Sequence, residues 1–150
     1  MFIHFFASGQ PGEEGDGAPG ERFYLAQQAR SADEVVAAIR RDGGVAHSWA
    51  GDLGDPASVP ALLDATERVL GPVEVLVNNA AHCVPDTFTP AALLGEDARA
   101  ADAFPLGPIS VESILRHFSV NSHAPALLMA EFARRHARRG AARPGAASSM

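Results

Sequence analysis

The chain has 150 residues, 47% of them hydrophobic, and a formal net charge of −6, which suits one folded domain. The negative charge weighs against nucleic-acid binding, no apolar run is long enough to cross a membrane, and a single cysteine excludes an internal disulfide framework. The apolar amino terminus lacks the basic flank of a signal peptide, so we expect a cytoplasmic protein. All twelve basic residues are arginine and the only tyrosine is Tyr24, which excludes chemistry that needs a lysine.

The first half of the chain alternates strands and helices. Residues 2–7 read as a short strand that is apolar on both faces, and a Gly- and Pro-rich loop follows over 8–20. Residues 21–42 suit a helix that is stopped by two glycines. A strand over 45–53 then ends in Gly-Asp-Leu.

A second helix is predicted to begin at Asp55, a favourable N-cap with Pro56 in the first helical position. It ends at Gly71-Pro72, and EVLVNNA over residues 74–80 is the next predicted strand. Residues 82–108 are a long Ala- and Pro-rich segment with weak helix signals, and the segment is longer than an ordinary connection.

The last predicted element is a long helix over residues 110–139. Ser110 is its N-cap candidate, but Ser113 stands where a capping box would need Glu or Gln, so we predict no such box. Pro125 should kink or break the helix. We expect its apolar side chains to lie in the core (Ile114, Leu115, Phe118, Leu127, Leu128 and Phe132).

Strands that are apolar on both faces and alternate with helices are typical of a parallel α/β sheet. In such sheets ligands bind at the carboxyl ends of the strands. Two unusual strand endings stand there, Asp52-Leu53 and Asn78-Asn79-Ala80-Ala81. We therefore expect residues 1–150 to form a single domain with a site between these two endings.

The run GDLGDPASVPALLDATERVLGPVEVLVNNAAH, residues 51–82, closely resembles the classical short-chain dehydrogenase/reductases. These proteins have a strand ending in Asp and an aliphatic residue, a helix, a Gly-Pro hinge and then a strand ending in Asn-Asn-Ala. SADEVVAAIRRDGGVAHSWAGDL upstream and HFSVNSHAPALLMAEFARR downstream extend the resemblance to roughly 30–140, with the ketoacyl-reductase-like members as the nearest group. It implies an incomplete, doubly wound Rossmann-type parallel sheet whose first and later strands are missing.

The resemblance implies roles for particular residues. Asp52 would accept a hydrogen bond from the adenine amino group, with the Leu53 N–H beside it. Asn78 would brace the neighbouring strand end, and the backbone of Ala80 and Ala81 would approach the ribose. The alternative is that these residues have only structural roles, in which Asp52 caps a turn and Asn78 begins a loop.

Two further residues receive roles from the same resemblance. Asn121 would hold a water in the proton relay, the alternative being a solvated helix residue. Ser8 follows the strand at 2–7, which ends without an acid for the ribose hydroxyls, and this favours NADP over NAD.

The catalytic part of the family pattern is missing. The family needs a glycine loop for the pyrophosphate, a serine, and a Tyr-x-x-x-Lys. Tyr24 has Gln28 in the lysine position and precedes the strand of Asp52, so we reject it as catalytic. GDGAPG over 15–20 matches the dinucleotide fingerprint literally, but its acidic neighbours and Pro19, which has no N–H, suit phosphate poorly.

We therefore expect a fragment of an NAD(P)-dependent oxidoreductase that acts on a small carbonyl or alcohol only in its full-length form. The alternatives are a non-catalytic nucleotide-binding or assembly module and, third, a nucleotide binder that uses residues 15–20. Helix 112–133 could also pair two subunits. No histidine spacing suggests a metal site.

The missing first strand would lie between residues 2–7 and 74–80. Its absence leaves unpaired backbone edges, so we expect a chain that is marginally stable, re-pairs its strands or self-associates. The arginines near the end of the long helix are predicted to form a solvated face, with an anion or partner site as the alternative (Arg134, Arg135, Arg138 and Arg139).

Overall fold

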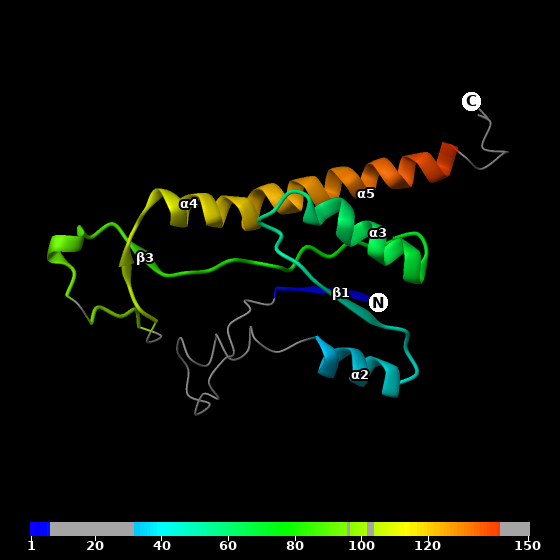
Figure 1. The fold of residues 1–150 in the computed structure, drawn as a ribbon, viewed down its shortest axis with the longest axis horizontal. Coiled ribbons are helices and arrows are strands. Elements are labelled where there is room, and N and C mark those ends of the chain that lie inside the picture. Colours follow the sequence, from blue (N-terminus) through cyan, green and yellow to red (C-terminus); the bar gives the residue numbers. More distant parts are fainter. Residues whose placement is uncertain (7–31, 96, 102–103, 142–150) are drawn as a thin grey trace.

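The structure is a computed structural model and describes residues 1–6, 32–95, 97–101 and 104–141. Strands β1 (Phe2–Phe5) and β2 (His47–Ala50) pair in parallel, with Phe2 opposite His47 and Phe5 opposite Ala50. Figure 1 shows α2 on one side of these strands and α3 and α5 on the other. This arrangement confirms a parallel α/β fold with helices on both faces.

Helix α2 (Asp33–Arg41) covers the end of the predicted helix 21–42, and residues 21–31 lie outside the described part. Helix α3 (Ser58–Leu70) begins later than predicted, with Ala57 as its N-cap. The Asp55 carboxylate accepts the Ala57 N–H at 2.9 Å, so it closes a turn before the helix and does not cap it. Local side-chain bonding of this kind competes with helical capping.

The long carboxyl-terminal helix has three parts: α4 (Val111–Phe118), the π-helical turn η2 (Ser119–His123) and α5 (Ala124–Ala141). The absence of a capping box was predicted wrongly. The Ser113 hydroxyl accepts the Ser110 N–H at 3.2 Å, and the Ser110 hydroxyl accepts the Ser113 N–H at 3.0 Å. A serine thus fills the role usually taken by Glu or Gln.

The irregularity predicted at Pro125 is present as the π-helical turn that directly precedes it. Proline has no N–H and its ring crowds the carbonyl four residues earlier, which is Asn121. Widening the turn is one way for a helix to continue past such a residue.

Residues 74–80 were predicted as a strand, and this is wrong: no strand is assigned there. Val75 and Val77 are each 77% exposed. Only Leu76 packs against the core cluster. A strand needs a neighbour to receive its backbone hydrogen bonds, and within the described residues this segment has none beside it.

The segment over 82–108, which showed weak helix signals in the sequence, carries little regular structure where it is described. It contains a 3₁₀ turn, η1 (Ala91–Leu93), and two very short strands, β3 (Asp86–Thr87) and β4 (Gly107–Pro108). The two strands pair in parallel and form a second small sheet. An isolated antiparallel bridge joins Arg99 to Pro105.

The core is small and lies where α3 and α5 meet the β1–β2 sheet. Its buried cluster contains five residues, and three partly buried side chains pack against it (Leu53, Val59, Leu62, Ala124 and Leu128; Phe2, Trp49 and Leu76). The apolar face of 112–133 was expected in the core, and this is wrong for most of it. Leu128 is buried, whereas Leu115, Phe118 and Leu127 are exposed.

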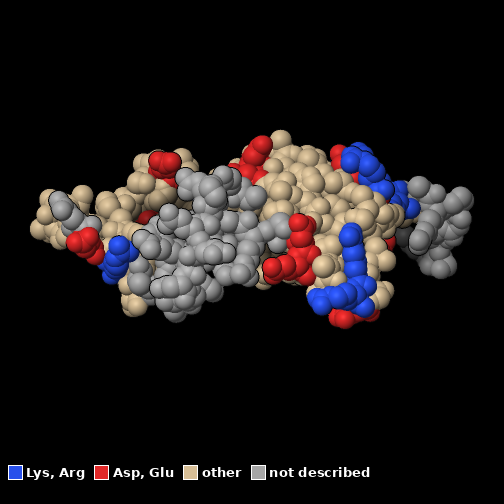
Figure 2. Space-filling model, turned by 60° about the horizontal axis from the view of Figure 1, so that its bottom comes forward, with Lys and Arg blue, Asp and Glu red and all other residues tan. Residues whose placement is uncertain are grey.

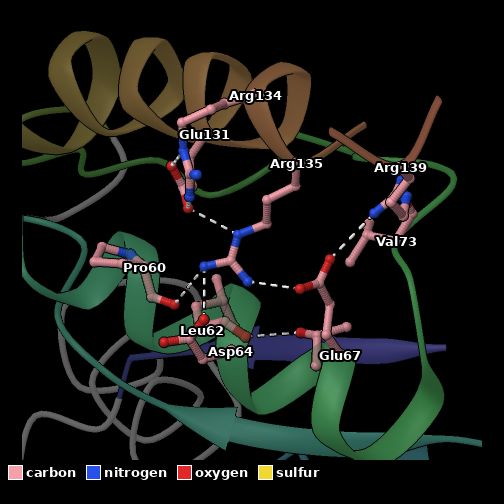
Figure 3. A network of polar contacts seen from close by, with 10 residues as sticks. Pro60, Leu62, Asp64, Glu67, Val73, Glu131, Arg134, Arg135 and Arg139 are labelled. Atoms are coloured by element: carbon pink, nitrogen blue, oxygen red, sulfur yellow. Dashed lines mark hydrogen bonds and ion pairs between the residues drawn. The ribbon is translucent and has the colours of Figure 1, made fainter. Parts of the chain in front are cut away.

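A network of ion pairs joins α5 to α3 (Figure 3). Arg135, 13% exposed, donates to Glu131 of its own helix at 2.7 Å, to Asp64 at 2.6 Å and to Glu67 at 2.7 Å. Arg139 donates to Glu67 at 3.1 Å and to the Val73 carbonyl at 2.8 Å. The prediction of a solvated arginine face is therefore wrong for these two residues.

The charges of this network shift the pKa values of its members. The guanidinium groups of Arg134 and Arg135 lower the pKa of Glu131 from 4.5 to about 2. Burial by itself lowers the pKa of Arg135, but its hydrogen bonds to Glu131, Asp64 and Glu67 outweigh burial and raise it. Both shifts favour the charged forms of Glu131 and Arg135.

Within the described residues, the helices are too short or too polar to span a membrane. Figure 2 shows that basic side chains on this face stand close to acidic ones and form no broad patch of one sign.

Candidate active site

Asp52 lies just after β2, at the carboxyl end of the sheet. One of its carboxylate oxygens accepts the Gly54 N–H at 2.7 Å, and the other accepts Nη1 of Arg116, from α4, at 2.9 Å. The hydrogen bond from Arg116 is the main cause that lowers the pKa of Asp52, against the opposing effect of burial. Leu53 is buried in the core. The Asp52 carboxylate, a charged hydrogen-bond acceptor, is thus held in place beside the buried Leu53.

Arg116 also lies 5.5 Å from the centroid of the Phe6 ring, in a cation–π contact. Its guanidinium crowds Gly54, because a Cβ added at that glycine would lie 2.1 Å from Nη1. A larger residue at position 54 would therefore displace the arginine from Asp52.

The second candidate strand ending, Asn78–Ala81, leads into a backbone anchor at His82. The Asn121 side chain, from the π-helical turn, accepts the His82 N–H at 2.7 Å and donates to the His82 carbonyl at 2.8 Å. Both halves of the carboxamide are therefore committed to one residue. Asn121 fixes where the chain leaves the Asn78–Ala81 segment.

His117 strengthens the same anchor. Its Nε2 accepts the Val84 N–H at 3.4 Å, so Nδ1 carries the proton and donates to the Ser113 carbonyl at 2.9 Å. Its ring lies 4.8 Å from that of His82 in an edge-to-face arrangement. Burial, followed by the nearby His117 and Arg116, lowers the pKa of His82. The two imidazole rings therefore face each other beside the Asn121 anchor.

One helical stretch holds both strand endings. Arg116 of α4 bonds to Asp52, while His117 and Asn121 bond to the chain just after Ala81. The two endings are at least 25 residues apart in sequence, from Leu53 to Asn78. The structure thus brings both segments to one helix, although the described residues 74–80 form no strand, so the two endings are not neighbouring ends of one sheet.

The predicted residues stand differently in this site. Asp52, Leu53 and Asn121 are anchored as described, and residues 78–81 are exposed between their neighbours. Ser8 and the glycine-rich run at 15–20 lie outside the described residues. No three His, Cys, Asp or Glu side chains in the described part are grouped as a metal site would require.

Sequence reasoning missed Arg116, His82 and His117. Arg116 and His117 fall on the predicted helix, but only the fold turns Arg116 toward an aspartate 64 residues earlier. The one usable signal was the position of His82, directly after Asn-Asn-Ala-Ala. Adjacent residues on a helix point in different directions, which is why Arg116 and His117 serve different strand endings.

The described residues fit part of a dinucleotide. The exposed Asp52 carboxylate and the adjacent Leu53 backbone can hold an adenine edge, and the small residues at 80–81 permit close approach of a sugar. The described residues around these endings offer one cation, Arg116, and it is already paired with Asp52. They therefore fit the adenosine end and supply no evident pyrophosphate cradle.

Comparisons with known proteins bear on the family and the fold of the chain. The short chain dehydrogenase family matches residues 18–143. A search of curated proteins found no significant match. Among solved structures, a blue fluorescent protein from a metagenomic library, in complex with NADPH, has a TM-score of 0.51 and 22% identity over 69% of this chain.

A second solved structure is the promiscuous reductase LugOII, which catalyses keto-reduction at C1 during lugdunomycin biosynthesis. It has a TM-score of 0.51 and 25% identity over 89% of this chain. Our chain spans only 34% and 41% of the lengths of these two proteins. The sheet is accordingly an incomplete Rossmann-type sheet, and the chain belongs to the short chain dehydrogenase family.

Proposed function

We propose that this chain is the adenosine-binding part of an NAD(P)-dependent oxidoreductase and that it does not turn over substrate by itself. The observation that supports this proposal is the single helical stretch that holds both strand endings, through Arg116, His117 and Asn121. In the full-length form, the reaction is hydride transfer between the cofactor and a small carbonyl or alcohol.

In this proposal each strand ending has one task. Asp52 accepts from the adenine amino group while the Leu53 N–H donates to the ring. The backbone at Asn78, Ala80 and Ala81 lies against the ribose, because small side chains leave that backbone open. When bound, the nicotinamide supplies or receives the hydride.

Asn121 keeps in this proposal the task that the resemblance implies, which is to hold a water of the proton relay. The side-chain carboxamide of Asn121 is hydrogen-bonded to the His82 backbone. We therefore propose that the main-chain carbonyl of Asn121 holds the relay water. Pro125 supports this role because it cannot donate to the carbonyl four residues earlier. That carbonyl therefore lacks its usual α-helical donor.

The absence of turnover follows from the side chains. The chain has no lysine, and its one tyrosine, Tyr24, is followed four residues later by Gln28. General acid catalysis at a carbonyl needs a proton donor of suitable pKa, and arginine holds its proton too tightly. Purified protein should not oxidise NADPH or NADH with a panel of ketones. Metal-independent turnover would contradict the proposal.

Nucleotide binding can be tested separately from turnover. AMP should bind weakly in isothermal titration calorimetry, and Asp52→Asn should weaken it several-fold by removing a charged acceptor. Asp55→Asn is the matched control, because that carboxylate bonds only to its own turn in the described structure. NADPH should bind somewhat more tightly than NADH. Equal AMP affinity in the Asp52 variant would overturn the assignment.

A second candidate function is a non-catalytic assembly module. Helices α4 and α5 expose a set of apolar side chains that a partner subunit could cover (Val111, Leu115, Phe118, Leu127 and Met129). Light scattering should then show a homodimer that Phe118→Glu dissociates. We also propose a cytoplasmic location, which cell fractionation would test.

A further inference from the structure

Arg116 uses little of its hydrogen-bonding capacity. A guanidinium carries several N–H groups in a planar fork, and within the described residues this one makes a single hydrogen bond, from Nη1 to Asp52 at 2.9 Å. The side chain is 32% exposed. All but one of its N–H groups are therefore without an acceptor in the part of the chain that the structure describes, and the exposed part of the guanidinium is open to a ligand.

Arg135 is the contrasting case, an arginine whose partners all belong to the fold. Its side chain is 13% exposed and donates to three carboxylates, those of Glu131, Asp64 and Glu67. Arg116 forms one ion pair among the described residues. Three carboxylates more than neutralise the charge of Arg135, whereas the single carboxylate beside Arg116 leaves an exposed guanidinium that can bind a second anion.

The guanidinium of Arg116 lies at the ends of both strands of the main sheet. Asp52 comes just after β2, and Phe6, whose ring centroid is 5.5 Å from Cζ of Arg116, directly follows β1. The end of β1 therefore presents an aromatic ring and a cation, and no carboxylate. A carboxylate at such a strand end accepts the free hydroxyls of a ribose and repels a phosphate, whereas a guanidinium attracts a phosphate.

We propose that Arg116 binds a 2′-phosphate on the adenosine whose base is held by Asp52, and that it thereby makes the chain select NADP(H) over NAD(H). This inference rests on the proposed function, because it concerns the same adenosine. It assigns the phosphate to a side chain of α4 and not to a strand ending. The planar fork of a guanidinium matches the oxygens of a phosphate, and the contact with the Phe6 ring holds that fork at the end of β1.

A purely structural role for Arg116 leads to a different expectation. If the arginine only joins α4 to the end of β2, its removal displaces Asp52 and weakens all adenine ligands alike. If it binds the phosphate, its removal weakens ligands with a 2′-phosphate by an additional factor. The ratio of the affinities for two phosphate isomers, measured in one protein, therefore separates the two roles, and adenosine reports on Asp52 alone.

The test uses the full chain and isothermal titration calorimetry with adenosine, 5′-AMP and 2′-AMP. We expect 2′-AMP to bind about tenfold more tightly than 5′-AMP. Arg116→Met keeps a long side chain and removes its charge, so it should equalise the two affinities while the affinity for adenosine changes less than about twofold. Arg138→Met is the matched control, because Arg138 is exposed and forms no ion pair with the described residues, and it should preserve the preference for 2′-AMP.

The outcomes separate this inference from the proposed function. Equal or weaker binding of 2′-AMP than of 5′-AMP, or an undiminished preference in Arg116→Met, would overturn the inference alone, provided that Asp52→Asn still weakens adenosine binding. Absence of any binding would overturn both. If Arg116→Met does not fold, ³¹P NMR of 2′-AMP bound to the wild type decides. An adjacent guanidinium should lower the second pKa of the phosphate from about 6, and an unchanged titration would overturn the inference.

Discussion

Two stretches of this chain have the same kind of sequence and different structures. FIHF over residues 2–5 is a strand, and EVLV over 74–77 is not. Both are short and mostly apolar, and FIHF precedes α2 while EVLV follows α3. The difference is the neighbour: β1 has β2 beside it, and 74–77 has no strand beside it within the described residues.

This difference shows that a segment with a strand-like sequence forms a strand only where a neighbouring strand can pair with it. The hydrogen bonds of a helix lie within one segment, whereas those of a strand must come from elsewhere. The helix α3 therefore forms close to its predicted limits, while the segment that follows it does not form the predicted strand. It is instead held by side chains, through Arg139 at one end and Asn121 at the other.

The largest expected difference between the two stretches is in packing. Leu62→Ala removes a buried side chain from the cluster behind β1 and should lower the free energy of unfolding by about 2–5 kcal/mol. Val77→Ala changes a side chain that is already exposed and should alter it by less than about 0.5 kcal/mol. Urea denaturation measures both, and equal losses would mean that residues 74–77 are packed as well as β1.

The arginine network is the next test. Arg135→Met leaves Glu131, Asp64 and Glu67 close together without their shared cation, and should cost about 2–3 kcal/mol of unfolding free energy. Arg138→Met is the matched control, because Arg138 is exposed and forms no ion pair with the described residues. A similar loss in both variants would show that the network does not hold α5 on α3.

A smaller effect is expected where the Asn121 side chain holds the His82 backbone. Asn121→Ala removes two hydrogen bonds to the His82 backbone and should cost about 1–2 kcal/mol. Hydrogen exchange at the His82 amide should accelerate, with that of β1 amides unchanged. Ser122→Ala, on the same turn, should leave the His82 amide protected. Faster exchange throughout the chain would instead indicate global destabilisation.

The smallest effect is a dependence of stability on pH. The folded-state pKa of Glu131 is about 2, below its ordinary value of 4.5. Its contribution is therefore fully present above about pH 4.5 and is lost as the pH falls toward 2. Glu131→Gln should make the thermal unfolding midpoint depend less on pH between pH 5 and 2.5. If the midpoint of the variant falls with pH as steeply as that of the wild type, the acid sensitivity comes from other carboxylates, such as Asp52.

The sequence predicted the elements whose bonds are local. The long carboxyl-terminal helix and its irregularity before Pro125 could be inferred from spacing and residue type. The strand predicted over 2–7 is present as β1 (Phe2–Phe5), because β2 supplies its backbone partners. Ser113 was missed as a capping partner because Glu and Gln dominate the known pattern, although a hydroxyl can accept the same N–H. The partner of each N-cap is decided by geometry and not by residue class alone.

The sequence singled out Asp52 and Asn121 as candidate site residues because both fall in recognisable motifs. Their actual bonding partners were not predictable. Arg116 meets Asp52 only because α4 crosses the end of β2, and the sequence contains no pattern that relates two residues 64 positions apart. Similarly, Arg135 was assigned to solvent because the acids of α3 that surround it lie more than 60 residues away.

The bonds from Asn121 reach only main-chain atoms of position 82. Any amino acid other than proline offers the same N–H and carbonyl there, so that position is free to vary during evolution without loosening the attachment. Position 121 has no such latitude, since few side chains can donate and accept side by side. Among relatives we therefore expect position 82 to vary and position 121 to remain asparagine.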